Sequence, residues 1–81
     1  MKVKEGQIFQ AVGETWNTWI PDGMTIHVFI SPDGREDHFG EIGEESEISG
    51  PNVFQVMGFN PRSFFKITGI GGGNAYLDVL V

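Results

Sequence analysis

The chain has no cysteine, few basic residues and no long apolar segment, and each absence removes a class of protein. Because none of its 81 residues is cysteine, disulfide bonds and thiolate zinc sites are excluded. Five Lys and Arg residues against eleven Asp and Glu give a formal net charge of −6, which argues against a nucleic-acid partner. The uncharged apolar runs are far shorter than the ~20 residues of a membrane span, so no membrane partner is expected.

The length of the chain predicts one small domain, residues 1–81. A domain of this size buries only roughly 60–65% of the surface that its unfolded chain exposes, so burial and ordering entropy nearly cancel. Without a disulfide or a metal, we expect extra support from a partner subunit or a larger body. Residues 1–6, which include Lys2 and Lys4, lack the apolar core of a signal peptide. We expect them to form an extended N-terminal arm that reaches an acidic neighbour.

Glycine and proline divide the chain into short apolar segments, which is typical of an all-β fold. There are twelve glycines and four prolines, and the longest helix-compatible stretch, 41–48, is too short to stand alone. We therefore expect a small sandwich or jelly-roll-like barrel of about six to seven short antiparallel strands. The expected strands are 7–12, 15–20, 24–30, 53–59, 64–70 and 75–81, with weaker candidates at 38–42 and 46–49.

Two of these strands have one wholly apolar face and one mixed face. In 24–30 the mixed face holds a threonine, a histidine and Phe29, and in 75–81 it holds Tyr76, an aspartate and Leu80. A half-buried sheet should alternate more cleanly, so these outer faces are candidates for a subunit contact; the alternative is that they face an irregular loop. The candidate interface residues are Trp16, Trp19, Phe29, Arg62, Phe64, Tyr76, Leu80, Lys2 and Lys4.

Trp16 and Trp19 lie among polar neighbours, Thr15, Asn17 and Thr18. Their spacing of three predicts that the two indoles lie on opposite faces of a regular strand. Three roles are open to them: core packing, an interface anchor, or a platform for a carbohydrate.

The glycine-rich stretch 69–74 superficially resembles a dinucleotide-binding fingerprint. It ends in Asn74 where the last glycine should stand, and a strand pattern follows it where phosphate binding needs a helix N-terminus. Glycine accepts positive φ and asparagine tolerates it, so we expect a hairpin turn here.

The remaining polar residues do not predict catalysis. The six carboxylates of 36–47 do not match the register of a calcium loop, so they are interpreted as a solvated face. His27 and His38 have no partner histidine at metal-ligand spacing, and Asp37 and His38 should point to opposite faces of a strand. No serine has the context of a nucleophile elbow. We expect no enzyme, no catalytic residue, no cofactor and no metal.

The C-terminal half combines segments 50–56 and 65–69 with the triplet Gly71-Gly72-Gly73 and an alternating terminal strand. This pattern resembles small virion proteins of tailed bacteriophages, in which a Val-x-Gly-x-Gly-Gly hairpin leads into a final strand. The resemblance implies a capsid decoration (cement) subunit or a related head or tail component. Its place would be the outer capsid surface of the virion, after synthesis in the host cytoplasm. The implied partners are the major capsid protein and further copies of the chain, as a homotrimer.

The preferred function is thus that of a non-enzymatic structural protein that bridges capsomers. Such a bridge buries apolar surface at joints under internal pressure, at roughly 25 cal/mol per Å². The alternatives are a carbohydrate- or receptor-binding β module that uses Trp16, Trp19 and Asn17, and a tail or baseplate component.

Overall fold

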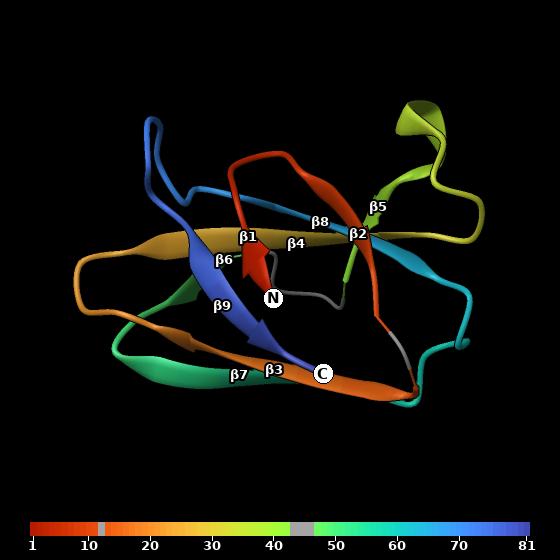
Figure 1. Cartoon of the computed structure of the whole chain (residues 1–81), viewed down its shortest axis with the longest axis horizontal. Coiled ribbons are helices and arrows are strands. Elements are labelled where there is room, and N and C mark those ends of the chain that lie inside the picture. The colour runs from red at the N-terminus through yellow and green to blue at the C-terminus, as the bar shows by residue number, and fades with distance from the viewer. Residues whose placement is uncertain (12, 43–46) are drawn as a thin grey trace.

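The computed structural model describes residues 1–11, 13–42 and 47–81, and within these ranges the chain forms nine β-strands and one three-residue 3₁₀-helix. The all-β class expected from the sequence is confirmed (Figure 1). The elements are β1 (Lys2–Val3), β2 (Ile8–Gln10), β3 (Thr15–Ile20), β4 (Thr25–Ser31), η1 (Glu36–His38), β5 (Gly40–Glu41), β6 (Glu47–Ser49), β7 (Asn52–Met57), β8 (Phe64–Thr68) and β9 (Leu77–Leu80).

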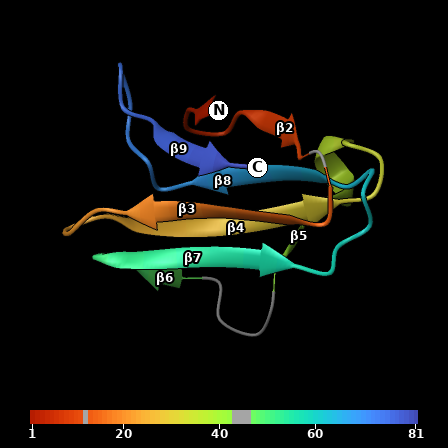
Figure 2. The same cartoon turned by 60° about the horizontal axis from the view of Figure 1, so that its bottom comes forward.

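The strands form two antiparallel sheets packed as a sandwich. The first sheet has the order β1-β9-β3-β7, and the second has the order β2-β8-β4-β5 with β6 also paired to β4. Figure 1 shows β4 and β8 above β3 and β7, and Figure 2 shows β9, β3 and β7 in their order across the first sheet. From β1 to β4 the chain changes sheet at every connection, so consecutive strands pack across the core rather than pairing.

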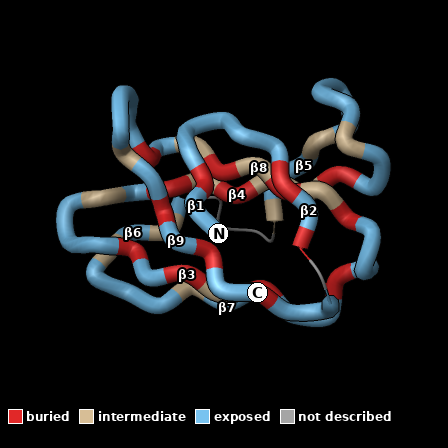
Figure 3. The backbone as a smooth tube through the Cα atoms, in the orientation of Figure 1, coloured by how far each residue is buried: buried red, intermediate tan, exposed pale blue. Residues whose placement is uncertain are grey.

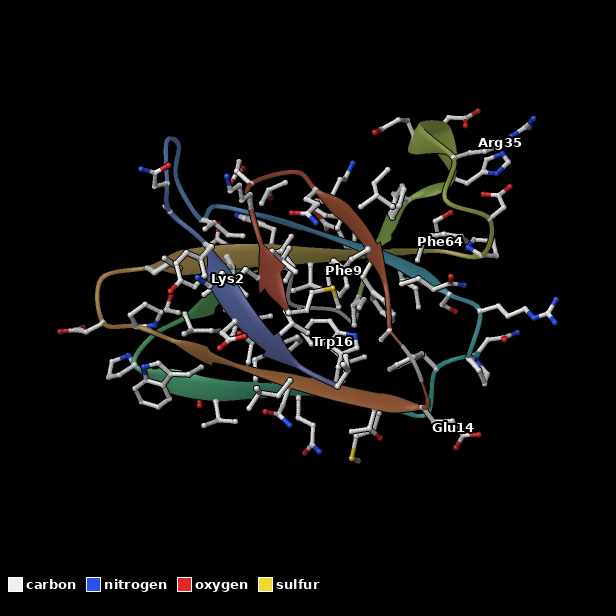
Figure 4. All side chains as sticks on the ribbon, in the orientation of Figure 1. Lys2, Phe9, Glu14, Trp16, Arg35 and Phe64 are labelled. Carbon is white, nitrogen blue, oxygen red and sulfur yellow. The ribbon has the colours of Figure 1, made fainter. Side chains whose placement is uncertain are left out.

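The core lies between the sheets and is centred on Trp16. Burial alternates along β3, which places this indole inward and Trp19 outward. Trp16 packs against the rings of Phe9, Phe54 and Phe65, with centroid distances of 5.5, 5.9 and 5.4 Å. Figure 4 shows Phe9 and Trp16 pointing toward each other between the sheets. The prediction that the two tryptophans face opposite sides is confirmed, as the alternation of a regular strand requires.

Buried residues alternate with more exposed residues along the strands of both sheets (Figure 3). In the second sheet, Val28 of β4 lies opposite Ile67 of β8, and Ile26 lies opposite Ile48 of β6. Ile26, Val28 and Ile67 are buried. Thr18 is also fully buried, and its hydroxyl donates to the carbonyl oxygen of Asp78 at 2.9 Å. This bond removes the cost of an unpaired hydroxyl and ties β3 to β9.

Residues 1–6, expected to be an arm that reaches a neighbour, fold onto their own chain. In β1, Lys2 lies opposite Asp78 and Val3 lies opposite Leu77. Val3 is fully buried, and the carbonyl oxygen of Met1 accepts the N–H of Val79 at 2.8 Å. Burial of an apolar side chain and completion of the edge of β9 explain this placement.

The glycine-rich stretch does not form the expected hairpin. It connects β8 in the second sheet to β9 in the first, so the two strands it joins do not pair with each other. Gly69 and Gly71 have φ of 91° and 105°, which lets the chain turn away from the second sheet. Turn-forming residues therefore mark the position of the connection correctly but do not indicate which sheet the next strand enters.

The expected strand 38–42 is shortened to β5, and the residues before it form η1. The prediction that Asp37 and His38 point apart is wrong, because the helical turn brings His38 Nε2 to 3.9 Å from the Asp37 carboxylate. His38 Nδ1 also lies 2.6 Å from Asp33 Oδ2. Val12, Glu44, Glu45 and Ser46, which entered the expected strands and the acidic face, lie outside the described residues.

Candidate functional site

The outer surface of β9, β3 and β7 carries four large apolar side chains that remain in solvent. Each strand buries its alternate positions in the core, so the intervening residues point outward. The four side chains are 57% to 69% exposed, and we call them the apolar face: Trp19, Val53, Met57 and Leu80.

Strand register makes this face continuous across three strands. Trp19 lies opposite Val53, and Thr15 lies opposite Met57. Between these two pairs, Asn17 lies opposite both Gln55 of β7 and Leu80 of β9. Cross-strand neighbours are about 4.5–5.5 Å apart at Cβ, so these side chains form one surface. The face consists of apolar groups around two central amides. Neither β3 nor β7 contains a charged residue, whereas β9 carries the exposed Asp78 on the same outward side as Leu80.

The outer surface of the second sheet is covered by its own side chains. Lys66 Nζ lies 5.4 Å from the centroid of the Phe29 ring and 4.8 Å from that of Phe39. The same ammonium lies 3.3 Å from Oε2 of Glu36. These cation–π contacts and the ion pair occupy the aromatic surface of this sheet. The apolar face of the first sheet has no such internal cover among the described residues.

The structure separates the nine predicted interface residues into four groups. Trp19 and Leu80 belong to the apolar face, whereas Trp16 is fully buried and is therefore not available as a surface anchor. Its role is core packing, one of the three interpretations open from the sequence. The paired sugar platform of Trp16 and Trp19 is excluded for the same reason.

Lys2 and Tyr76 lie near the opposite edge of the first sheet. Lys2 Nζ is 4.7 Å from the centroid of the Tyr76 ring. Lys4 follows β1 and is exposed, and its backbone N–H donates to Oε1 of Gln7 at 3.1 Å. These residues flank β9 and do not extend the apolar face across β3 and β7.

Phe29, Phe64 and Arg62 lie away from the apolar face. Phe29 and Phe64 are half-buried on the second sheet, and the ring of Phe64 lies against Gly34. Arg62 is exposed in the turn before β8, where its carbonyl oxygen accepts a hydrogen bond from Nε2 of Gln10 at 3.0 Å. The structure therefore does not join these three residues with Trp19 and Leu80.

The sequence pattern does not identify three of the outward residues of β7, which are Val53, Gln55 and Met57. They alternate with Phe54 and Val56, which are also apolar. With apolar residues on both faces of a strand, alternation does not reveal which face is buried. The absence of charge from residues 48–61 is the signal that could have identified this region.

Glu5 forms a second feature, at the glycine-rich connection. Its carboxylate accepts backbone N–H groups of Gly69, Ile70 and Gly71, at 3.1, 2.6 and 3.3 Å. Partial burial raises the pKa of Glu5, but the three backbone hydrogen bonds lower it by more, so its net pKa is below the ordinary value of 4.5. The N–H groups of the glycine-rich connection are thus used by a side chain of the same chain.

We expect Glu5→Gln to lower the free energy of unfolding at pH 7 by less than about 1 kcal/mol, because the carboxylate is largely exposed to solvent. The pKa of Glu5 is lower in the folded protein than in the unfolded chain. The contribution of Glu5 to the free energy of unfolding is therefore complete above pH 4.5 and is lost as the pH falls through the pKa of the folded state. Urea unfolding at a series of pH values should therefore show the difference from the parent shrinking below pH 4.5. Glu14→Gln, at an exposed loop carboxylate, is the matched control, and an equal loss there would contradict the role of Glu5.

In the described part of the chain, no three His, Cys, Asp or Glu side chains group in a way that could hold a metal ion. None of the helical residues described forms a helix long and apolar enough to cross a membrane. Comparison with protein-family models, curated proteins and solved structures gives no match to this chain.

Proposed function

We propose that this protein is a non-enzymatic structural subunit of the capsid-decoration type, which docks on the major capsid protein through its apolar face. The observation that supports this function is the exposure of Trp19, Val53, Met57 and Leu80 on one sheet surface, whose strands β3 and β7 contain no charged residue. Contiguous exposed apolar side chains of this kind are typical of protein interaction sites. The resemblance of the C-terminal half to small virion proteins supplies the class of partner.

The energetics of the apolar face suit docking. At about 25 cal/mol per Å², burying the exposed part of each of its side chains contributes roughly 1–2 kcal/mol before the costs of association. Trp19 is the largest of them, and tryptophan is enriched among residues that dominate interface energies. Asn17 and Gln55 supply hydrogen-bonding groups at the centre of the same surface, which can set the orientation of a partner.

The two sheets have different surfaces, which favours one orientation on a capsid. The first sheet would face the capsid with its uncharged strands β3 and β7. The second sheet carries Lys66, Glu36 and the acidic residues around η1, and would face the solvent. The net charge of −6 also favours an outer location, because the packed genome inside a capsid attracts basic residues.

We expect Trp19→Ser to weaken binding to expanded capsids of the phage that encodes this chain by at least ~10-fold, because it removes the largest anchor of the interface. Co-sedimentation of purified protein with capsids measures this loss. Ile8→Ser is the matched control, because Ile8 is an exposed apolar residue on the second sheet. Equal weakening by both variants, or no binding by the parent protein, would contradict the proposal.

A second candidate function, carbohydrate binding, is favoured by one observation. The exposed indole of Trp19 shares its face with the amides of Asn17 and Gln55, and such a ring with flanking amides can stack on and hydrogen-bond a sugar. A glycan that changes the tryptophan fluorescence of the parent, but not that of Trp19→Phe, would favour this function over capsid docking.

A further inference from the structure

β7 lies at an edge of the first sheet and differs from the other edge strands in its length and composition. β7 is six residues long, whereas the other edge strands of the described residues, β1, β2, β5 and β6, have two or three. Short strands and charged residues are common protections of a sheet edge. β1 has both, because it contains Lys2 and is followed by Lys4. β7 has neither, since Asn52–Met57 contains no charged residue and no proline.

The backbone groups that point out of this edge follow from the pairing with β3. The N–H of Gly58 donates to the carbonyl oxygen of Glu14 at 3.0 Å, one position beyond the Thr15–Met57 pair. Hydrogen-bonded and non-hydrogen-bonded pairs alternate along an antiparallel ladder. Consequently the backbone N–H and C=O groups of Phe54 and Val56 form hydrogen bonds with β3. Val53, Gln55 and Met57, the residues that point outward from the sheet, direct their N–H and C=O groups toward the free edge.

Charge determines which partner can approach this edge. A second copy of the chain also carries a net charge of −6, so most approaches bring like charges together. Residues 48–61 contain no charged side chain, and they include all of β7. This neutral edge is therefore a surface at which two copies can meet without placing carboxylates against each other.

We propose that two copies of this chain pair through their β7 strands, antiparallel and across a two-fold axis. Gln55 lies on the axis opposite Gln55 of the second copy, and Val53 lies opposite Met57 of the second copy. Each of these pairs exchanges two backbone hydrogen bonds, the two glutamine amides bond to each other, and the flanking Val–Met pairs are apolar. The contact is self-complementary, as a two-fold interface requires.

This pairing joins two first sheets into one surface. The 18 strand residues of one first sheet cover roughly 300 Å² at ordinary strand spacings, a little over a third of what one partner contributes to a standard interface. Two copies side by side present about twice that area to a larger partner. The pairing does not depend on the proposed docking to a capsid. It gives a dimer, whereas the resemblance to phage virion proteins implies a trimer.

The absence of native cysteine gives a direct test. Residues opposite each other in a hydrogen-bonded antiparallel pair have Cα atoms about 5.5 Å apart, within the range of a disulfide. Oxidation of Gln55→Cys by copper–phenanthroline should therefore give a covalent dimer at least ~10-fold faster than oxidation of Leu80→Cys, which is on the same face but two strands away. Equal rates for the two variants, or no covalent dimer, would overturn the proposal.

Light scattering of the parent protein provides an independent measurement. The expected mass is twice the 8.9 kDa of one chain, and a monomer or a trimer would overturn the pairing. Val53→Lys places a charge beside the edge and should raise the dimer dissociation constant at least ~10-fold, whereas Leu80→Lys should leave it unchanged. Loss of the dimer in both variants would indicate face-to-face packing and would contradict edge pairing. Both side chains are exposed, so far-ultraviolet circular dichroism should show an intact fold.

Discussion

Replacing Trp16 with alanine is expected to destabilise the protein by about 3–5 kcal/mol, the range typical of a large aromatic removed from a core. Trp16 is fully buried and contacts the rings of Phe9, Phe54 and Phe65, so the cavity would open where the two sheets meet. Domains of this size have stabilities near the lower end of about 5–15 kcal/mol, so this loss removes most of the margin. Urea unfolding followed by circular dichroism measures it.

Two variants make this result specific to the core. Trp19→Ala alters an exposed indole three residues away and should cost less than about 1 kcal/mol. Trp16→Phe retains an aromatic ring and should cost less than the alanine variant. The phenylalanine variant also removes the indole N–H of Trp16, which has no hydrogen-bond partner among the described residues. Similar losses for Trp16→Ala and Trp19→Ala would show that Trp16 is not the centre of the core.

Gly69→Ala is expected to lower the free energy of unfolding by about 2–4 kcal/mol. Alanine is unfavourable at the positive φ of this residue, and its Cβ would clash with a neighbouring strand. Gly69 has φ of 91°, and a Cβ at this position would overlap the carbonyl oxygen of Thr25 at the start of β4. A backbone atom cannot rotate away as a flexible side chain can. Thermal or urea unfolding measures the loss.

Gly72→Ala is the matched control within the same glycine-rich connection. A Cβ at Gly72 would have no neighbouring atom within 4 Å, and this glycine does not have positive φ. We expect this variant to be neutral or slightly stabilising, because alanine restricts the unfolded chain. If Gly72→Ala were as harmful as Gly69→Ala, the contact with Thr25 would not be the cause.

Local sequence signals predicted most of the strands. The expected strand end at Ile20 is followed by Pro21, Asp22 and Gly23, residue types that favour turns, and the N–H of Met24 donates to the carbonyl oxygen of Pro21 at 3.2 Å. The expected strand 15–20 coincides with β3, and the spacing of Trp16 and Trp19 correctly separates core from surface. These features depend on residues that are close together in the sequence, where turn chemistry and alternation are informative.

Long-range pairing was not predictable in the same way. The two residues of β1 are too few for a periodic pattern, and their pairing with β9 depends on strands at the far end of the chain. The burial of Phe29 against Lys66 likewise depends on Phe39 and Glu36, which come from the segment around η1. The apolar face was found only in part, because Val53 and Met57 lie on a strand with apolar residues on both sides.

The position of β9 has a consequence for biosynthesis. This strand is synthesised after all the others described, yet it lies between β1 and β3, so the first sheet cannot close until residues 77–80 have left the ribosome. Pairing of segments so distant in sequence is slow, since a long loop must be closed before any contact is gained. Until then β3 lacks its partner strand on the side that pairs with β9, and the first sheet of the nascent chain has a second unpaired edge.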